Sequence, residues 1–484
     1  VYELFMDLEA NDEQLDFPIL YGIARQGIVV YDPDDVKGIS VEEGDAKIKK
    51  SAKGMQGLDI TPLFDTIIKH TQPYPDRNAE PLQLQISALG YDDYIGRLGI
   101  GRITKGVIKA GSTVAVAKGD GQIEQKKINQ VFVYRGLKRM AVDQAEAGDI
   151  VVISGIADIS IGETICDPAD PQPLEMIHIE EPTLSMYFMV NKSPFAGKSG
   201  KFVTSRHIRE RLNKELEVNV GLKVEETDST DSFKVSGRGE LHLSILIENM
   251  RREGYELAVS KPEVIMRRGD HNQVQEPIEE VVLSVPDEYS GSVISKLNVR
   301  KGMMQEMHSE NGFTHLEYLV PTRGLLGYRS EFINDTRGEG TMVRRFAKFD
   351  DYVGEIPQRT NGVAIAQEEG VATPYAIFNI SERVQMFIEP GTKVYEGMII
   401  GMNARSDDMV VNPCKAKKAT NMRAAGSDDN IKLAPARTFT LEEALEFIDD
   451  DELVEIVPDD IRLRKKYLKE LERRRSGRKI KQED

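Results

Sequence analysis

Basic side chains gather in one stretch near the C-terminal end that contains no acidic residue. Residues 412–423 read NPCKAKKATNMR and carry a local charge of +4. Lysine and arginine can neutralise RNA phosphates and release counterions, and an asparagine among them can hydrogen-bond a base or ribose edge. The residues that could make such contacts are Lys415, Lys417, Lys418, Asn421 and Arg423. An exposed, solvated loop is the alternative interpretation of the same stretch.

A second source of positive charge is the last 24 residues, from Ile461 to Asp484. They hold 11 Lys and Arg against 4 Asp and Glu, a net charge of +7, whereas the whole chain has a formal charge of -17. The other 460 residues therefore carry -24. This tail is either a solvated, disordered end or a contact to an RNA backbone. The acidic total argues against indiscriminate coating of DNA.

Two short motifs have the residue types of nucleotide-binding loops without their spacing. The sequence GKS at residues 197–199 ends like a phosphate-binding P-loop, but Lys192 stands where the first glycine of that loop is needed. The sequence NKSP at residues 191–194 begins like a guanine-binding Asn-Lys-x-Asp motif, but Pro194 replaces the aspartate. Neither motif is therefore predicted to bind a nucleotide.

The remaining polar residues do not assemble into an active site. The seven histidines lack metal-binding spacing, and His242 is expected to pack at the start of a helix. The carboxylates of residues 449–452 are interpreted as a solvated helix end rather than a metal site. No catalytic set of Ser, His, Asp or Cys can be named, so no catalytic residue and no metal ligand is predicted.

Three arginines, Arg238, Arg251 and Arg252, have two open interpretations. They could face RNA phosphates. They could equally pair with Glu240, Glu248 and Glu253 along one helix, because residues three and four apart are neighbours on a helix surface.

The composition is that of a soluble chain with several domains. The 484 residues are 40% apolar and 30% charged, and at ~150 residues per domain the length predicts about three to four domains. No stretch approaches the ~18–20 uninterrupted apolar residues of a membrane-spanning helix, and no secretory signal is visible. Cys166 and Cys414 form neither a disulfide framework nor a thiolate metal site, which indicates a reducing compartment.

Residues 1–77 have the pattern of an incomplete α/β unit. LDFPILYGIA is expected to be a buried strand, and TPLFDTIIKHT an amphipathic helix with Thr61 as N-cap and Pro62 as its first residue. A strand, a long polar insert and a helix cannot cover a sheet, so the segment is interpreted as the end of an α/β domain whose front is missing.

Short β runs from residue 80 to about 167 then predict a small β-barrel.

Two similar units follow the barrel. Each opens with Glu-Pro and a strand, at Glu181 and Glu276, 95 residues apart. Each continues as helix, two strands, helix and strand, which predicts a divergent repeat of split-βαβ, ferredoxin-like domains.

From about residue 357 the pattern is β-rich again. TPYAIFNI is expected to be a strand, and Thr440 to open a capping box with Glu443 at the start of a helix.

Longer motifs carry a resemblance to a known family. The segment SGRGELHLSILIENMRREGYELAVSKPEV, from Ser236 to Val264, resembles the third domain of translational GTPases. SPFAGKSGKFVTSR, PTRGLLGYRSEF, NDTRGEGTM, VYEGMIIGMNARSDD, KKATNMRAAG and LEEALEFIDDDELVEIVPDDIRLRKKYL narrow the match. Together they resemble BipA/TypA, a family of ribosome-binding translational GTPases, from Leu4 to about Lys466. The C-terminal motifs are not shared with EF-G or LepA.

The resemblance implies a multidomain fold of α+β and β parts. The implied domains are a C-terminal remnant of an α/β GTPase domain (1–77), a translation-factor β-barrel (80–170), two ferredoxin-like domains (181–268 and 276–356), and a β-rich, family-specific C-terminal domain with the basic tail (357–484).

The resemblance also implies GTP and Mg²⁺ as cofactors of the intact parent protein. The P-loop, the switch regions and the Asn-Lys-x-Asp motif of the family are expected before Val1. The last guanine-contacting motif stands here as residues 21–24, where only Ala24 fits the family pattern. This chain by itself is therefore expected to lack the groups that bind and hydrolyse GTP.

The function implied by the resemblance is ribosome binding during large-subunit assembly and in growth under stress or cold. The implied partners are both ribosomal subunits, ribosomal RNA and the acceptor end of a tRNA, which the basic stretch would contact. A cytoplasmic monomer is expected, or one in an organelle stroma if a transit peptide lies upstream. The alternatives are a fragment of a LepA- or EF-G-like factor and a non-catalytic ribosome-associated scaffold.

Overall fold

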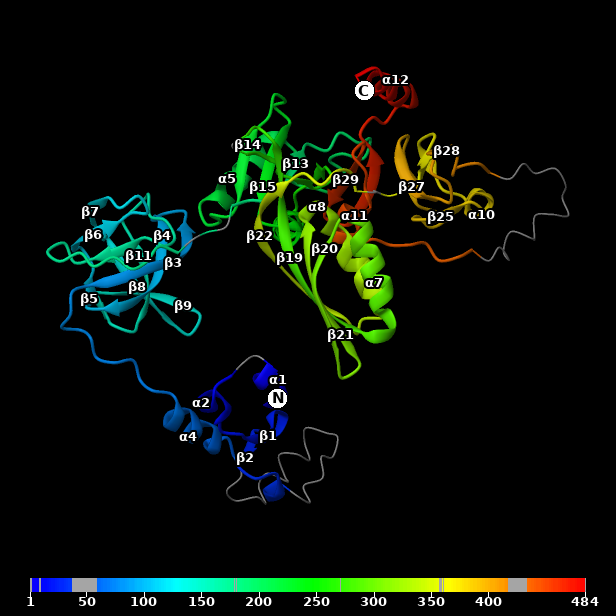
Figure 1. The fold of residues 1–484 in the computed structure, drawn as a ribbon. Coiled ribbons are helices and arrows are strands. Elements are labelled where there is room, and N and C mark those ends of the chain that lie inside the picture. The colour runs from blue at the N-terminus through cyan, green and yellow to red at the C-terminus, as the bar shows by residue number, and fades with distance from the viewer. Residues whose placement is uncertain are drawn as a thin grey trace.

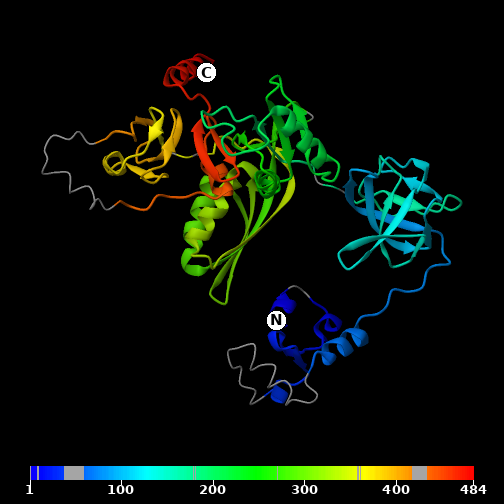
Figure 2. The ribbon, with the colours of Figure 1, turned by 180° about the vertical axis from the view of Figure 1, so that it is seen from behind.

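The computed structural model describes residues 2–7, 10–36, 59–177, 179, 181–269, 271–356, 359, 361–416 and 433–483. The chain forms a series of mostly β units from the N-terminus, blue in Figure 1, to the C-terminus, red. The β-barrel and the C-terminal elements lie on opposite sides of two central units in both views (Figures 1 and 2). A mostly β, multidomain fold was expected from the sequence; the exact limits of the five domains stay a prediction.

The N-terminal segment is a small assembly of short elements. These are α1 (Tyr2–Asp7), α2 (Asp12–Leu15), β1 (Tyr21–Ile23), η1 (Ala24–Gln26), β2 (Ile28–Val30), η2 (Pro33–Val36) and α4 (Thr61–His70), with β1 and β2 antiparallel. The prediction of a buried strand over LDFPILYGIA is wrong, because β1 has three residues and its Tyr21 is exposed. The predicted N-cap is also wrong by one residue: Ile60 is the N-cap, and the Asp59 carboxylate accepts the N–H of Thr61 at 2.8 Å.

The β-barrel is built on an eight-stranded sheet in the order β7-β6-β12-β3-β4-β11-β8-β9. Its strands are β3 (Gln83–Asp92), β4 (Gly96–Lys105), β5 (Val107–Lys109), β6 (Thr113–Ala117), β7 (Ile123–Lys127), β8 (Gln130–Arg135), β9 (Lys138–Val142), β10 (Gln144–Glu146), β11 (Ile150–Ser154) and β12 (Thr164–Cys166), with β5 and β10 paired apart. Alternating apolar residues fill its interior, among them Leu84, Ile86 and Ile165. Gly106 links β4 to β5 at a φ of +72°, where an added Cβ would lie 2.7 Å from the backbone of Leu82.

The first split-βαβ unit consists of β13 (Leu184–Met189), α5 (Ser205–Leu216), β14 (Lys223–Glu226), β15 (Ser232–Gly237), α6 (Glu240–Glu253) and β16 (Leu257–Val259). Its strands lie in the order β14-β15-β13-β16, and the short β17 (Glu263–Val264) adds to β13. Side chains of α5 and α6, such as Ile208 and Ile247, pack on Phe188 and Phe233 of the sheet.

The second split-βαβ unit repeats this arrangement. It consists of β19 (Val274–Pro286), α7 (Asp287–Val299), β20 (Met303–Glu310), β21 (Phe313–Pro321), α8 (Thr322–Leu325), α9 (Tyr328–Asp335) and β22 (Thr341–Asp351), and β18 (Arg267–Arg268) pairs with β19. The strands lie in the order β20-β21-β19-β22. In both units the second strand is at one edge and the fourth at the other, as a split-βαβ repeat requires.

The C-terminal unit contains β23 (Val363–Ala366), β24 (Gly370–Val371), α10 (Pro374–Ser381), β25 (Val384–Met386), β26 (Lys393–Val394), β27 (Met398–Asn403), β28 (Met409–Val411), α11 (Leu441–Phe447), β29 (Glu452–Val457), β30 (Asp460–Lys465) and α12 (Glu470–Glu483). The prediction of a strand over TPYAIFNI is wrong. Thr373 caps helix α10 by accepting the N–H of Ala376, and Pro374 is its first residue. The capping box of Thr440 and Glu443 at the start of α11 is confirmed.

The hairpin of β29 and β30 joins the C-terminal unit to the first split-βαβ unit. β16 pairs with β29 in antiparallel register, with Leu257 opposite Ile456, and β30 pairs with β27. One sheet therefore runs from β14 through β16 and β29 to β28, although the two halves are about two hundred residues apart in sequence. The apolar core is continuous across the junction, because Leu257, Val454 and Ile399 belong to one buried cluster.

Candidate nucleic-acid interface

Of the five residues predicted to contact RNA, Lys415 lies within the described chain. It follows β28, and its side chain is exposed. Lys417, Lys418, Asn421 and Arg423 lie outside the described residues. The residues on either side of the basic stretch show how it is attached.

The first end of the stretch is held at the start of α10. The Thr373 hydroxyl donates to the carbonyl oxygen of Lys415 at 2.8 Å, and the Thr373 N–H donates to the Pro413 carbonyl at 2.9 Å. The side-chain amide of Asn412 donates to Glu368 Oε1 at 2.7 Å. These contacts fix the backbone of Lys415 and leave its ammonium group in solvent.

The described residues that follow the basic stretch, from Leu433 on, are held against the same unit. Leu433 packs on the apolar cluster of the C-terminal unit, and the Arg437 N–H donates to the Met386 carbonyl at 2.8 Å. The guanidinium carbon of Arg437 lies 4.6 Å from the centre of the Phe439 ring. The structure pairs Arg437 with no carboxylate among the residues it describes. Arg437 is therefore a further cation of the C-terminal unit, one that the sequence analysis missed.

Arg437 borders a groove of about 760 Å³ between α6, residues 436–442 and the β29–β30 turn. The other arginines of the groove have carboxylate partners: Arg251 and Arg252 share Glu248, and Arg462 pairs with Glu455. Phe387 and Phe439 supply aromatic surface, with ring centroids 4.7 Å apart. An arginine over an aromatic ring can stack on a base or bind a phosphate.

A buried polar network fixes the groove wall. Glu455 is fully buried, and its carboxylate accepts from Arg462 (2.9 Å), Asn191 (2.6 Å), Ser193 (2.6 Å) and Tyr395 (2.5 Å). Burial alone raises the pKa of a carboxyl group, but the donors, above all Arg462, outweigh it and lower the pKa of Glu455. Burial, followed by the charge of Glu455, raises the pKa of Tyr395 well above its ordinary value.

The GKS loop holds a carboxylate of its own chain. The backbone N–H groups of Gly197 and Gly200 donate to the two oxygens of Glu256, at 3.0 and 3.2 Å, and Asn191 donates to the same group at 2.8 Å. Glu256 is fully buried. The Glu256 carboxylate occupies the place where the amide groups of a P-loop would bind a phosphate. This agrees with the prediction that the loop is not a P-loop.

A second ion-pair network crosses from the linker after the second split-βαβ unit to the β29–β30 hairpin. Arg359 donates to both oxygens of Glu452, at 2.8 and 2.9 Å, and Lys465 lies 3.0 Å from the same carboxylate. The interpretation of residues 449–452 as a solvated helix end is wrong for Glu452, which is fully buried at the start of a strand.

The two arginines near the end of α6 pair with a carboxylate. Glu248 accepts from Arg251 at 2.7 and 2.9 Å and from Arg252 at 2.7 Å, and the hydrogen bond from Arg251 contributes most to lowering the pKa of Glu248 to about 2. The other two expected acids pair elsewhere: Glu240 with Arg344 and Glu253 with Arg211.

Residues at the start of α6 have structural roles. His242 is half-buried; its Nδ1 accepts the N–H of Arg238 at 3.3 Å, and its Nε2 lies 2.8 Å from the side-chain amide of Asn219. The guanidinium of Arg238 lies over Gly221. The expected packing of His242 at a helix start is confirmed.

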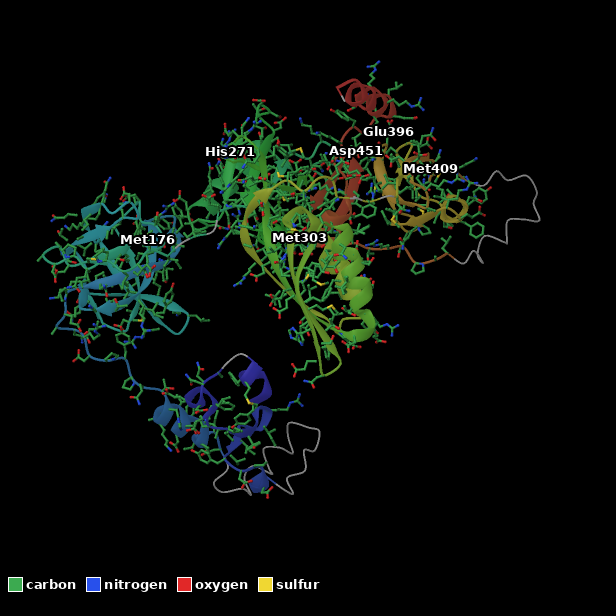
Figure 3. The ribbon with its side chains drawn as sticks, in the orientation of Figure 1. Met176, His271, Met303, Glu396, Met409 and Asp451 are labelled. Carbon is green, nitrogen blue, oxygen red and sulfur yellow. The ribbon has the colours of Figure 1, made fainter. Side chains whose placement is uncertain are left out.

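The basic tail starts in strand β30 and continues as the anchored helix α12. The N–H of Glu470 donates to Glu396 Oε1 at 3.3 Å, and Glu396 lies next to α12 in Figure 3. Arg474 pairs with Glu470 at 2.5 Å, and Arg473 donates to the Tyr467 carbonyl at 3.1 Å. The positive charge of the tail therefore starts on the C-terminal unit.

The GTP and Mg²⁺ implied by the resemblance have one expected contact in this chain, Ala24. This residue is exposed in the one-turn helix η1, and its carbonyl accepts the N–H of Gly27 at 3.2 Å. The described residues contain no group of three His, Cys, Asp or Glu side chains suited to a metal ion. The residues that the structure describes around Ala24 do not form a nucleotide site.

Comparison with known families agrees with this architecture. The family described as "Elongation factor Tu domain 2" matches residues 96–166, and "Elongation factor G C-terminus" matches residues 273–360. "TypA/BipA C-terminal domain" matches residues 361–470, which include the described ends of the basic stretch and the β29–β30 hairpin.

Curated relatives match nearly the whole chain. "Large ribosomal subunit assembly factor BipA" of Salmonella typhimurium is 47% identical over 486 residues, which cover 100% of this chain and 76% of that protein. The protein of the same name in Haemophilus influenzae is 48% identical over 99% of this chain and 74% of its own length. That of Bacillus subtilis is 45% identical, with 99% and 76% covered.

The chain belongs to the TypA/BipA family. The resemblance seen in the sequence is thereby confirmed, and the C-terminal match favours this family over the LepA or EF-G type. No helix in the described part of this TypA/BipA chain is long and apolar enough to cross a membrane.

Proposed function

We propose that this TypA/BipA protein binds the ribosome and acts in assembly of the large subunit. The main support is the sequence identity of 45–48% to relatives named as large-subunit assembly factors, over 99–100% of the chain. The elongation-factor domains support a ribosomal partner, because related units belong to factors that work there. The proposal places the protein with ribosomes in the cytoplasm, as a monomer.

The proposed RNA contact is the C-terminal unit. Lys415, within the basic stretch, and Arg437, which follows it in the chain, both present cations without a carboxylate partner in the described structure. Lys417, Lys418 and Arg423 extend this charge, and Asn421 could hydrogen-bond a base or ribose edge. Ribosomal RNA and the acceptor end of a tRNA are the two proposed ligands. The barrel would meet the small subunit.

The experiment is co-sedimentation with isolated 30S and 50S subunits, 70S ribosomes and immature large-subunit particles. The proposal expects saturable binding with a preference for particles that contain large-subunit RNA. Replacing Lys415, Lys417 and Lys418 with alanine should weaken binding and flatten the salt dependence by roughly two to three units of log–log slope.

Replacing the same three lysines with arginine is the matched control, because it keeps the charge. This variant should bind with the salt slope of the original chain. Equal binding by the alanine and arginine variants at every salt concentration would show that the basic stretch does not contact the ribosome. Failure of the original chain to bind any particle would exclude the ribosome as its partner.

The role of GTP is a separate part of the proposal. The family resemblance implies GTP and Mg²⁺ in the GTPase domain, and this chain by itself is expected to bind neither tightly. Titration with fluorescent GTP in the presence of Mg²⁺ measures this. Tight, Mg²⁺-dependent binding would contradict the expectation.

A role in stress- or cold-adapted growth also belongs to this proposal. Complementation of a deletion strain at low temperature measures it.

A further inference from the structure

The second split-βαβ unit has one edge strand that no other part of the described chain covers. β20 ends the sheet order β20-β21-β19-β22, and all eight of its residues, Met303–Glu310, are exposed. It runs from Met303, labelled in Figure 3, to the hairpin end that extends away from the first split-βαβ unit and the C-terminal unit in Figures 1 and 2. An edge strand presents unpaired backbone N–H and C=O groups, which can pair with another extended chain.

Only part of this edge is regular. A bulge interrupts the pairing with β21 between Met304 and Glu306. From Glu306 to Glu310 each residue has one partner, and the hairpin closes through Asn311 and Gly312, both at positive φ. Five consecutive residues therefore offer a regular edge, about the length of an ordinary strand.

The two faces beside this edge differ in chemistry. Met307 lies opposite Leu316, which is buried under α7, so Met307 belongs to the helix-covered face. Met307 is nevertheless 49% exposed, which gives this side of the edge an apolar side chain open to a partner. On the other face, His308 stacks on His315 at 4.8 Å between ring centroids.

The open face of the edge is acidic. Glu306 and Glu310 alternate with Met307 and Ser309 along the strand and lie on the side of His308. The structure gives neither carboxylate a cationic partner in the residues it describes, and β20 contains no lysine or arginine. These charges repel an RNA backbone. They also oppose antiparallel pairing with a second copy of β20, because like charges would lie across from each other.

We propose that the edge of β20 from Glu306 to Glu310 is a docking site for an extended protein segment in which apolar residues alternate with lysine or arginine. The segment adds a strand to the sheet through its backbone. Its apolar side chains lie beside Met307, and its cations lie opposite Glu306 and Glu310. The partner is thus a basic protein segment, and the site is independent of the RNA contact proposed for the C-terminal unit.

The probe is a short, labelled peptide that alternates Lys and Val, added to the full chain. Fluorescence anisotropy measures its affinity, and hydrogen exchange locates it. The proposal expects saturable binding with slower amide exchange across Glu306–Glu310. Methylating alternate backbone nitrogens of the peptide keeps its charge and removes its donors, so this version should bind at least about tenfold more weakly.

Charge reversal separates recognition from general attraction. The double change Glu306→Lys and Glu310→Lys should weaken the Lys–Val peptide about tenfold and create binding of a Glu–Val peptide. The matched control is Glu339→Lys with Asp351→Lys, two exposed acids before and at the end of β22 on the opposite edge. This control should keep the original affinity.

Several results would overturn the proposal. These are absence of saturable binding, equal affinity of the methylated peptide, equal affinity of the Glu306 and Glu310 double variant, or protection outside Glu306–Glu310. Protection of the same residues by an RNA oligonucleotide, or by concentration-dependent dimerisation without peptide, would assign the edge to a different occupant and equally overturn it.

Discussion

Arg462 and Arg464 lie two positions apart on β30, yet changing each to methionine should have different effects. Arg462 Nη2 donates at 2.9 Å to Glu455, a carboxylate with no exposed surface. Removing one partner of a buried pair costs about 3–5 kcal/mol, because an uncompensated charge remains. Three neutral donors still hydrogen-bond the Glu455 carboxylate in the variant, and each bond contributes about 1 kcal/mol. The loss should therefore lie at the low end of this range. We therefore expect Arg462→Met to lower the free energy of unfolding by about 3 kcal/mol.

Arg464 is the matched control. It is 4% exposed, its Nε has no hydrogen-bond partner, and the described structure pairs it with no carboxylate. Burial lowers its pKa. Replacing an unsatisfied buried cation with an apolar side chain of similar length removes a desolvation cost. Arg464→Met should therefore be neutral or stabilising by about 1 kcal/mol.

The assay is hydrogen exchange followed by mass spectrometry over a urea series, since the chain contains no tryptophan for intrinsic fluorescence. Because β16 and β29 pair directly, Arg462→Met should reduce protection of Leu257–Val259 and of Glu452–Val457 by the same amount. Adding Glu455→Gln should restore part of it. The reasoning is refuted if the two arginine variants lose protection equally, or if β29 opens while β16 keeps its original protection.

Further predictions concern other parts of the chain. Burial raises the pKa of Glu240 from 4.5 to about 7, so the folded state binds this proton more tightly; the contribution of Glu240 to stability should be fully present below about pH 4.5 and be lost, by up to about 1–3 kcal/mol, as the pH rises through about 7. Glu240→Gln should flatten this dependence in thermal melts. Gly106→Ala should destabilise the β-barrel by about 2–4 kcal/mol, measured as exchange of its strands, because the new methyl group meets the backbone of Leu82 at positive φ. Thr373→Ala should cost about 1–2 kcal/mol and speed exchange at residues 413–416, since one hydroxyl caps α10 and holds Lys415.

Local signals predicted several elements from the sequence. The Glu-Pro repeat at 95 residues led to two units with the same strand order, and Thr440 with Glu443 marked the start of α11. The failure over TPYAIFNI has a local cause as well. A short apolar run does not distinguish a strand from a helix, and the signal that decides for a helix here is Thr373 followed by Pro374 at its start.

The buried charges could not be predicted from neighbouring residues. The amide of Asn191 and the carboxylate of Glu455 are 264 residues apart in sequence and 2.6 Å apart in the structure. From the sequence alone, a charged residue in a strand is predicted to be exposed, because its buried partner is not known. Of the candidate interface, the sequence placed Lys415 in an exposed position, whereas Arg437 became a candidate only when the fold showed its guanidinium over Phe439.

The pairing of β16 with β29 sets an order of events during synthesis. Leu257 leaves the translating ribosome 199 residues before Ile456, the residue it faces in the sheet. At roughly 5–20 residues per second, the edge of β16 stays open for about 10–40 s on each nascent chain. During that time its apolar strand is available to chaperones or to β16 of a neighbouring nascent chain on the same messenger RNA. Protease digestion of chains stalled before and after residue 457 measures this window: the first unit should become resistant only in the longer chains.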